Sequence, residues 1–143
     1  MAVVAARARP PLLSAISGSP RVRVAPFTTK GTAGSWTVRW RIANDGDRPI
    51  RIVNAIQPHS QFRTPETRVD RDVGSGLATD VSLPVRFDQP PGAVVENAFL
   101  IVVLRSESDW RLLARVRVTA GKNGEPLAGD SVVVTTQEIG APD

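Results

Sequence analysis

The sequence predicts an all-β protein, an antiparallel β-sandwich of seven or eight short strands. Apolar and polar residues alternate, or apolar residues run together, in seven or eight short segments. Turn-forming residues separate these segments at intervals of about ten residues. No segment shows the apolar period that is typical of a helix.

The length and composition of the chain favour one domain. Its 143 residues are enough to bury a core. We expect the domain over residues 21–138, with a flexible arm at 1–20 and a tail at 139–143. The chain has no cysteine, which excludes disulfides and thiolate metal sites. Arginines and prolines interrupt the apolar residues of the arm, unlike a secretory signal, and no run reaches the roughly 20 apolar residues of a membrane span. The sequence therefore favours a cytoplasmic location.

The N-terminal half predicts three strands in order. Residues 21–24 alternate, and residues 30–34 are typical of a turn. Residues 35–43 give the clearest alternation, with large apolar side chains on one face and polar side chains on the other. Residues 44–49 are rich in Asn, Asp and Gly and predict a turn, after which residues 50–56 predict the third strand.

The middle of the chain predicts a long polar connection and one further strand. Residues 57–76 are polar, and they could hold one edge strand near 67–73. Residues 78–88 alternate again. Pro84 lacks a backbone N–H, so we expect one side of this strand to have no ladder partner. Residues 89–92 (QPPG) then break the chain sharply.

A hairpin over residues 94–118 is expected at the centre of the fold. Its first strand, at 98–104, is apolar at every position, as in a strand that is covered on both faces. A buried helix is the alternative for this stretch. Its second strand, at 110–118, alternates between apolar residues and arginines. Residues 120–130 predict a Gly-rich connector, and residues 131–138 predict a last strand.

The pattern WTVRWRIANDGDRPIRI, followed by LPVRFDQPPG and an apolar strand, resembles bacterial immunoglobulin-like sandwich domains, including the PapD-like kind. The resemblance covers about residues 21–119. It implies a binding or spacer module. The disulfide and the tyrosine corner of antibody-type domains are absent because the chain has neither Cys nor Tyr. Immunoglobulin order would place strands 21–25, 35–43 and 79–87 in one sheet and strands 50–56, 98–104 and 110–119 in the other.

The strand at 98–104 predicts an apolar surface. Whichever of its sides points inward, the opposite side is apolar too, and arginines would rim it. Such a patch is typical of a contact surface. Either the chain covers it with its N-terminal arm or C-terminal strand, or a protein partner or second copy does so. The candidate interface residues are Val53, Ala55, Leu100, Val102 and Leu113, with the rim residues Arg51, Arg111 and Arg115.

The outer face of the first sheet predicts an anion-binding surface. Residues 1–44 contain seven basic and no acidic side chains, whereas residues 45–143 contain 11 basic and 14 acidic ones. Guanidinium groups bind phosphate and acidic proteins. No aromatic side chain shares this face for base stacking, which argues against nucleic acid, and a solubilising surface is the simpler interpretation. The candidate anion-binding residues are Arg21, Arg23, Arg39, Arg41 and Arg86.

No motif predicts catalysis, a metal or a cofactor. His59 and Ser60 are adjacent in the chain, and adjacent residues rarely bring a base within hydrogen-bond reach of a nucleophile. Asp45 and Asp47 lack the downstream Glu of an EF-hand calcium loop.

Asp70 and Asp72 would share one side of an extended segment, but Arg68 and Arg71 lie close enough to neutralise them. We therefore expect a non-enzymatic protein-interaction or assembly module that uses no cofactor. Binding of an anion or nucleic acid through the arginine face is the alternative. The sequence identifies no small-molecule ligand.

Overall fold

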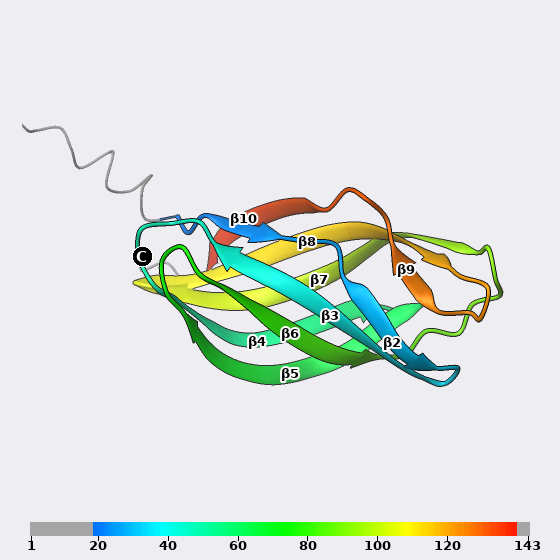
Figure 1. Cartoon of the computed structure of the whole chain (residues 1–143). Coiled ribbons are helices and arrows are strands. Elements are labelled where there is room, and N and C mark those ends of the chain that lie inside the picture. Colours follow the sequence, from blue (N-terminus) through cyan, green and yellow to red (C-terminus); the bar gives the residue numbers. More distant parts are fainter. Residues whose placement is uncertain (1–18, 140–143) are drawn as a thin grey trace, which may run out of the picture.

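The structure is a computed structural model that describes residues 19–139, and within that range it forms ten strands and no helix. The strands form two antiparallel sheets that pack as a sandwich (Figure 1), which confirms the predicted fold class. None of the described residues forms a helix long and apolar enough to span a membrane. The strands are β1 (Val22–Val24), β2 (Thr28–Thr32), β3 (Ser35–Asn44), β4 (Ile50–His59), β5 (Phe62–Val73), β6 (Ala78–Val85), β7 (Val94–Ser106), β8 (Ser108–Ala120), β9 (Pro126–Ala128) and β10 (Val133–Ile139).

Strand β3 is the centre of the four-stranded sheet. Strands β1 and β2 follow one another along one side of β3, and β6 pairs with the other side. Pro84 of β6 lies opposite Thr37 of β3. Among residues 19–139, no strand pairs with the far side of β6, and just beyond its end one bridge between Arg63 and Arg86 joins the two sheets. The sheet edge predicted at Pro84 is therefore confirmed.

Strand β7 is the centre of the six-stranded sheet. The strand order is β10-β8-β7-β4-β5, with β9 also paired to β8. The β7–β8 hairpin is tighter than the expected charged loop, because Arg105 pairs with Asp109 and Ser106 with Ser108. Only Glu107 remains at the turn, in the left-handed region with a φ of 67°.

The six strands that immunoglobulin order assigns to the two sheets lie in those sheets. The polar connection expected at 57–76 is mostly strand, because β4 continues to His59 and β5 spans Phe62–Val73 rather than about 67–73. Two short strands also add to the prediction. Residues 30–34 are not all turn, because β2 continues through Thr32 and only Ala33 and Gly34 connect it to β3. Strand β9 lies within the connector at 120–130. Both are polar edge segments without alternation, so their pairing depends on the neighbouring strand rather than on their own sequence.

The inward side chains of the two sheets form one core. The alternation of β3 and β8 predicts which side chains these are, and burying each large apolar one stabilises the fold by roughly 2 kcal/mol. Phe27, between β1 and β2, packs against Phe62 and Trp40, with ring centroids 5.3 and 5.0 Å away. The buried residues of β3 and β8 include Trp36, Val38, Trp40, Ile42, Trp110, Leu112, Ala114, Val116 and Val118.

Candidate protein-interaction surface

An apolar cluster lies on the outer face of the six-stranded sheet, over its three central strands. Ile101 of β7 is directly opposite Leu113 of β8 and Ile56 of β4. Residues directly opposite in antiparallel strands point to the same face. Their side chains are all partly exposed. We define the outer apolar cluster as Ile56, Phe99, Ile101, Val103 and Leu113.

Three of the candidate interface residues do not lie on this surface. Ala55, Leu100 and Val102 have an exposed fraction of 0% and belong to the core. The register explains why. Val102 is opposite Leu112 and Leu100 is opposite Ala114, and the register shift in β4 places Ala55 opposite Val102. Strand β8 must turn its arginines toward water, so its small and apolar residues point inward. Both sides of β7 are apolar, so the sequence of β7 does not show which side points outward. The outer side is identified by the β7–β8 register, because the residues of β7 that lie opposite outward-facing residues of β8 also point outward.

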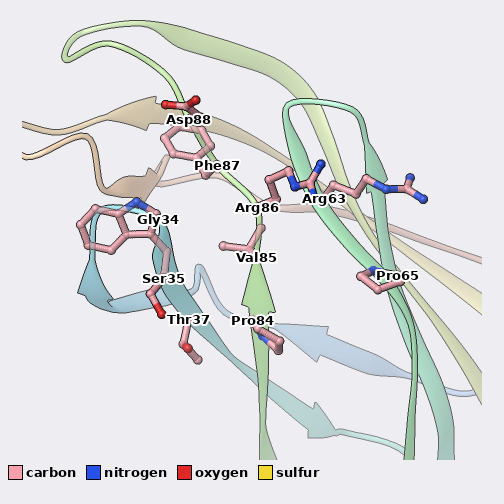
Figure 2. Close-up of a pocket in the computed structure, with 11 residues that line it drawn as sticks. Gly34, Ser35, Thr37, Arg63, Pro65, Pro84, Val85, Arg86, Phe87 and Asp88 are labelled. Carbon is pink, nitrogen blue, oxygen red and sulfur yellow. The ribbon is translucent and has the colours of Figure 1, made fainter.

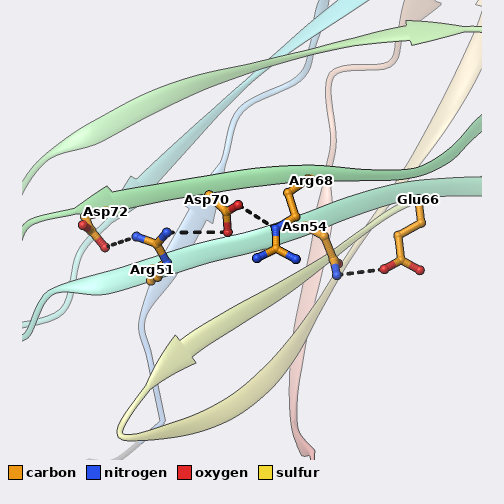
Figure 3. A network of polar contacts seen from close by, with 6 residues as sticks. All are labelled: Arg51, Asn54, Glu66, Arg68, Asp70 and Asp72. Atoms are coloured by element: carbon orange, nitrogen blue, oxygen red, sulfur yellow. Dashed lines mark hydrogen bonds and ion pairs between the residues drawn. The ribbon is translucent and has the colours of Figure 1, made fainter.

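A bulge adds one more apolar side chain at the margin of the cluster. The register of β4 shifts between Ile52 and Asn54 relative to both of its neighbours. Ile52 stays buried, whereas Val53 and Asn54 are both partly exposed. Asn54 donates a hydrogen bond to Glu66 of β5 at 3.0 Å (Figure 3). Of the predicted apolar candidates, Val53 and Leu113 are therefore partly exposed.

An ion-pair network forms the rim of the cluster over β4 and β5 (Figure 3). Arg51 lies 3.0 Å from Asp72 and 3.5 Å from Asp70. Arg68 donates to Asp70 at 2.6 Å, and this hydrogen bond holds the pKa of the Asp70 carboxyl below its ordinary value. The two aspartates are thus neutralised, by Arg51 and Arg68 rather than by Arg68 and Arg71 as the sequence predicts.

The opposite rim, on β8, carries arginines of a different kind. Arg111 is opposite Val103, and Arg115 is opposite Phe99, so both lie directly beside the cluster and are exposed. No carboxylate within residues 19–139 forms an ion pair with either one. Each of these two guanidinium groups has five N–H donors, which are available to a carboxylate from outside the described part of the chain.

The C-terminal strand does not cover the cluster. Strand β10 pairs with β8 from Val133 to Ile139 and extends the sheet sideways. Thr135 lies beside Leu113 in this register, at the border of the cluster rather than above it. The other segment predicted to cover this face, the N-terminal arm, lies outside the described residues except for Ser19 and Pro20.

The five arginines predicted on the outer face of the four-stranded sheet are all exposed, but two of them are neutralised. Arg23 forms an ion pair with Asp45 at 3.0 Å, and Arg41 forms one with Asp80 at 3.0 Å. These hydrogen bonds lower the pKa of both carboxyls. Arg21 donates to the backbone carbonyl of Asp45 at 3.2 Å. The remaining two candidates are Arg39 and Arg86.

Arg86 lines a groove at the junction of the two sheets (Figure 2). The groove has a volume of about 770 Å³ and lies between the β2–β3 turn, the start of β5 and the end of β6. Arg86 and Arg63 pair through two backbone hydrogen bonds, of 3.1 and 2.7 Å. Like charges directly opposite one another are destabilising. Neither guanidinium has an ion-pair partner among residues 19–139, whereas seven other arginines do.

The single histidine has a local structural role. The ring nitrogen Nδ1 of His59 accepts the backbone N–H of Gln61 at 3.0 Å in the β4–β5 turn. Within the described residues, no group of three His, Cys, Asp or Glu side chains could hold a metal ion.

Comparison of the chain with models of protein families and with curated proteins finds no match. The fold and the surface together define a two-sheet antiparallel β-sandwich with an apolar cluster on the outer face of its larger sheet.

Proposed function

We propose that this protein is a non-enzymatic interaction module of the immunoglobulin-like kind, and that it contacts a protein through the outer apolar cluster. One observation carries the proposal. Ile56, Ile101 and Leu113 form a continuous apolar row across three neighbouring strands on an outward face, and they are partly exposed. An apolar patch with a polar rim is typical of protein contact surfaces.

The other sheet shows that this composition is not required by the fold. The outer face of β3 and β6 carries Thr37, Arg39 and Ser82, which are ordinary for a sheet face in water. The six-stranded sheet departs from this pattern only over β7 and its two neighbours. A contact surface explains why the apolar side chains are concentrated there.

The rim indicates the chemistry of the partner. Arg51 and Arg68 are neutralised within the chain, whereas Arg111 and Arg115 have no carboxylate partner within residues 19–139. A partner surface with an apolar centre and carboxylates on one side would complement this face. Charge-assisted hydrogen bonds of this kind set orientation and specificity more than affinity.

Site-specific photo-crosslinking tests the proposal. A photo-reactive phenylalanine analogue replaces Ile101 in one variant and Thr37, on the outer face of the other sheet, in the control. We expect covalent adducts in extract of the source cells, with another protein or with a second copy, from position 101 and not from position 37. Adding an Arg111→Glu/Arg115→Glu change should reduce the yield several-fold. Equal yields from both positions would contradict the proposal.

A second candidate function, anion binding, is favoured by the uncompensated pair Arg63 and Arg86. An anion that bridges both guanidinium groups would relieve their repulsion. A heparin oligosaccharide is a suitable probe, and its binding should weaken as salt increases. The Arg63→Gln/Arg86→Gln variant should lose binding, whereas Arg23→Gln/Arg41→Gln should retain most of it, because those two arginines are already neutralised. If both variants lose heparin binding equally, the binding depends on the overall positive charge of the protein and not on Arg63 and Arg86.

A further inference from the structure

Strand β10 is an edge of the six-stranded sheet, and no strand of the described part of the chain pairs with its outer side. It pairs with β8 over its whole length, from Val133 to Ile139. Its other side makes no backbone hydrogen bond to residues 19–139. Figure 1 shows β10 at the border of the molecule, next to β8. An edge of this kind presents unpaired N–H and C=O groups along its length and is a template for another strand.

Two other long edges of the sandwich are protected against such pairing. Strand β5 contains Pro65, the charged residues Arg68, Asp70, Arg71 and Asp72, and a left-handed backbone at Asp70, with a φ of 49°. Proline, charges and irregular backbone are the usual means of blocking an edge. Strand β6 contains Pro84. In addition, the guanidinium of Arg71, from β5, donates to the backbone carbonyl oxygen of Asp80 in β6, so this acceptor is not available to another strand.

Two of the short edge strands, β1 and β9, are protected as well. Strand β1 has only three residues. Strand β9 also has three, and the carbonyl of its Pro126 already accepts the hydroxyl of Thr29 at 2.5 Å. Strand β10 has none of these features. Its sequence, VVTTQEI, has no proline and no basic residue, and Glu138 is its one charge.

The sequence of β10 is also complementary to itself. In an antiparallel pair centred on Thr136, Val133 would lie opposite Ile139 and Thr135 opposite Gln137 of the second copy. All four side chains belong to the outer face, because Thr135 shares the side of Leu113 in the β8 register. The exposed fraction of Val133 is 45%, so contact with Ile139 would shield an apolar side chain that is now in water.

The single charge of the strand does not oppose this arrangement. In the same register, Glu138 lies opposite Val134 and not opposite its own copy. The Glu138 carboxylate already accepts the hydroxyl of Ser108 at 2.7 Å, which turns it toward β8. A two-fold axis makes each contact occur twice, as in a closed dimer.

We propose that two copies of this chain pair through β10, edge to edge and antiparallel, so that their six-stranded sheets become one continuous sheet. The inference goes beyond the proposed function, because it concerns the strand edge and not the outer apolar cluster. The dimer would place both clusters on the same face of the joined sheet. Because an edge contact is small, the dimer should form in a concentration-dependent way.

Sedimentation equilibrium of the full chain over a range of concentrations tests the dimer. The wild-type mass should rise from 15.3 kDa toward twice that value. Thr135→Lys/Gln137→Lys places lysines opposite lysines in the proposed register, and Thr135→Glu/Gln137→Glu places glutamates opposite glutamates. Both positions are exposed, so both variants should fold. Each variant alone should remain at the single-chain mass, and an equimolar mixture of the two should recover the doubled mass.

A second variant distinguishes self-association through the β10 edge from self-association through the outer apolar cluster. Ile101→Asp changes the outer apolar cluster and should leave the dimer intact. If Ile101→Asp abolishes the dimer and the lysine variant does not, self-association uses the face and the edge proposal is wrong. A wild-type mass that stays at one chain up to about 1 mM would also overturn it. So would a mixture of the two charge variants that fails to associate.

Discussion

The indole N–H of Trp40 donates to the side-chain oxygen of Gln57 at 2.9 Å, across the interior of the sandwich. Trp40 belongs to the four-stranded sheet and Gln57 to the six-stranded sheet. The amide nitrogen of Gln57 donates to the hydroxyl of Thr64 at 2.7 Å, and that hydroxyl donates to the carbonyl of Pro84 at 2.6 Å. Trp40, Gln57 and Thr64 are all 0% exposed. The two sheets are therefore connected by a chain of three hydrogen bonds, two of them fully buried, as well as by apolar packing.

Gln57→Leu should reduce the free energy of unfolding by about 1–3 kcal/mol, because it leaves the Trp40 N–H buried without a partner. Adding Trp40→Phe should cost less in the Gln57→Leu background than in the wild type, since the stranded donor is then removed. Urea unfolding of the four proteins of this cycle measures the coupling. Additive losses would show that the hydrogen bond contributes nothing.

Trp110→Phe is the matched control for Trp40→Phe. The Nε1 of Trp110 is buried and has no hydrogen-bond partner within the described residues. Both replacements remove similar volume, but only Trp40→Phe leaves an amide oxygen unpaired. We expect Trp40→Phe to lose more stability than Trp110→Phe, and the reverse order would contradict this account of the buried chain.

Substitutions at two neighbouring residues of β7 should differ sharply. Leu100→Asp places a carboxylate in the core, where Leu100 is 0% exposed, and should unfold the protein. Ile101→Asp places it on the partly exposed outer face and should cost only about 1 kcal/mol, the scale of strand propensity. Circular dichroism and thermal unfolding distinguish the two. If Leu100→Asp folds and Ile101→Asp does not, then Ile101 faces the core and Leu100 faces outward, which contradicts the assigned sides of β7.

The sequence predicts most of the fold where one side of a strand is polar. The arginines of β3 and β8 decide which side chains enter the core, and Pro84 identifies an edge. Prediction fails where this contrast is missing. Both sides of β7 are apolar, so Leu100 and Val102 are assigned to the wrong face by β7 alone. Gln57 looks like the start of a polar connection, because its partners Trp40 and Thr64 come together only in the folded chain.

Acid should destabilise the protein through carboxylates paired with arginine. Hydrogen bonds from Arg23 and Arg41 lower the folded-state pKa of Asp45 and Asp80. Their contribution to stability is therefore fully present above the unfolded value of about 3.9, and it is lost as the pH falls through the lower folded values.

Thermal unfolding between about pH 7 and pH 2 measures this effect. The Asp45→Asn/Asp80→Asn variant should be slightly less stable at neutral pH, because exposed ion pairs contribute little. Its melting temperature should fall less steeply in acid, so that the two curves approach one another at the lowest pH. Parallel curves would show that other groups cause the acid dependence.

Gly31→Ala should destabilise the β2–β3 hairpin more than Gly34→Ala does. Both glycines have positive φ, 115° and 84°, so an alanine at either position costs about 1–2 kcal/mol of backbone strain. A Cβ at Gly34 would meet no atom within 4 Å, whereas a Cβ at Gly31 would overlap the carbonyl oxygen of Ser35. The Ser35 backbone belongs to the ladder with β2, so Gly31→Ala must displace one strand from the other. Urea unfolding should show the larger loss for Gly31→Ala, and hydrogen exchange should show faster exchange of the β2 amides in that variant. Equal losses would mean that the chain relieves the overlap without giving up the pairing of β2 with β3.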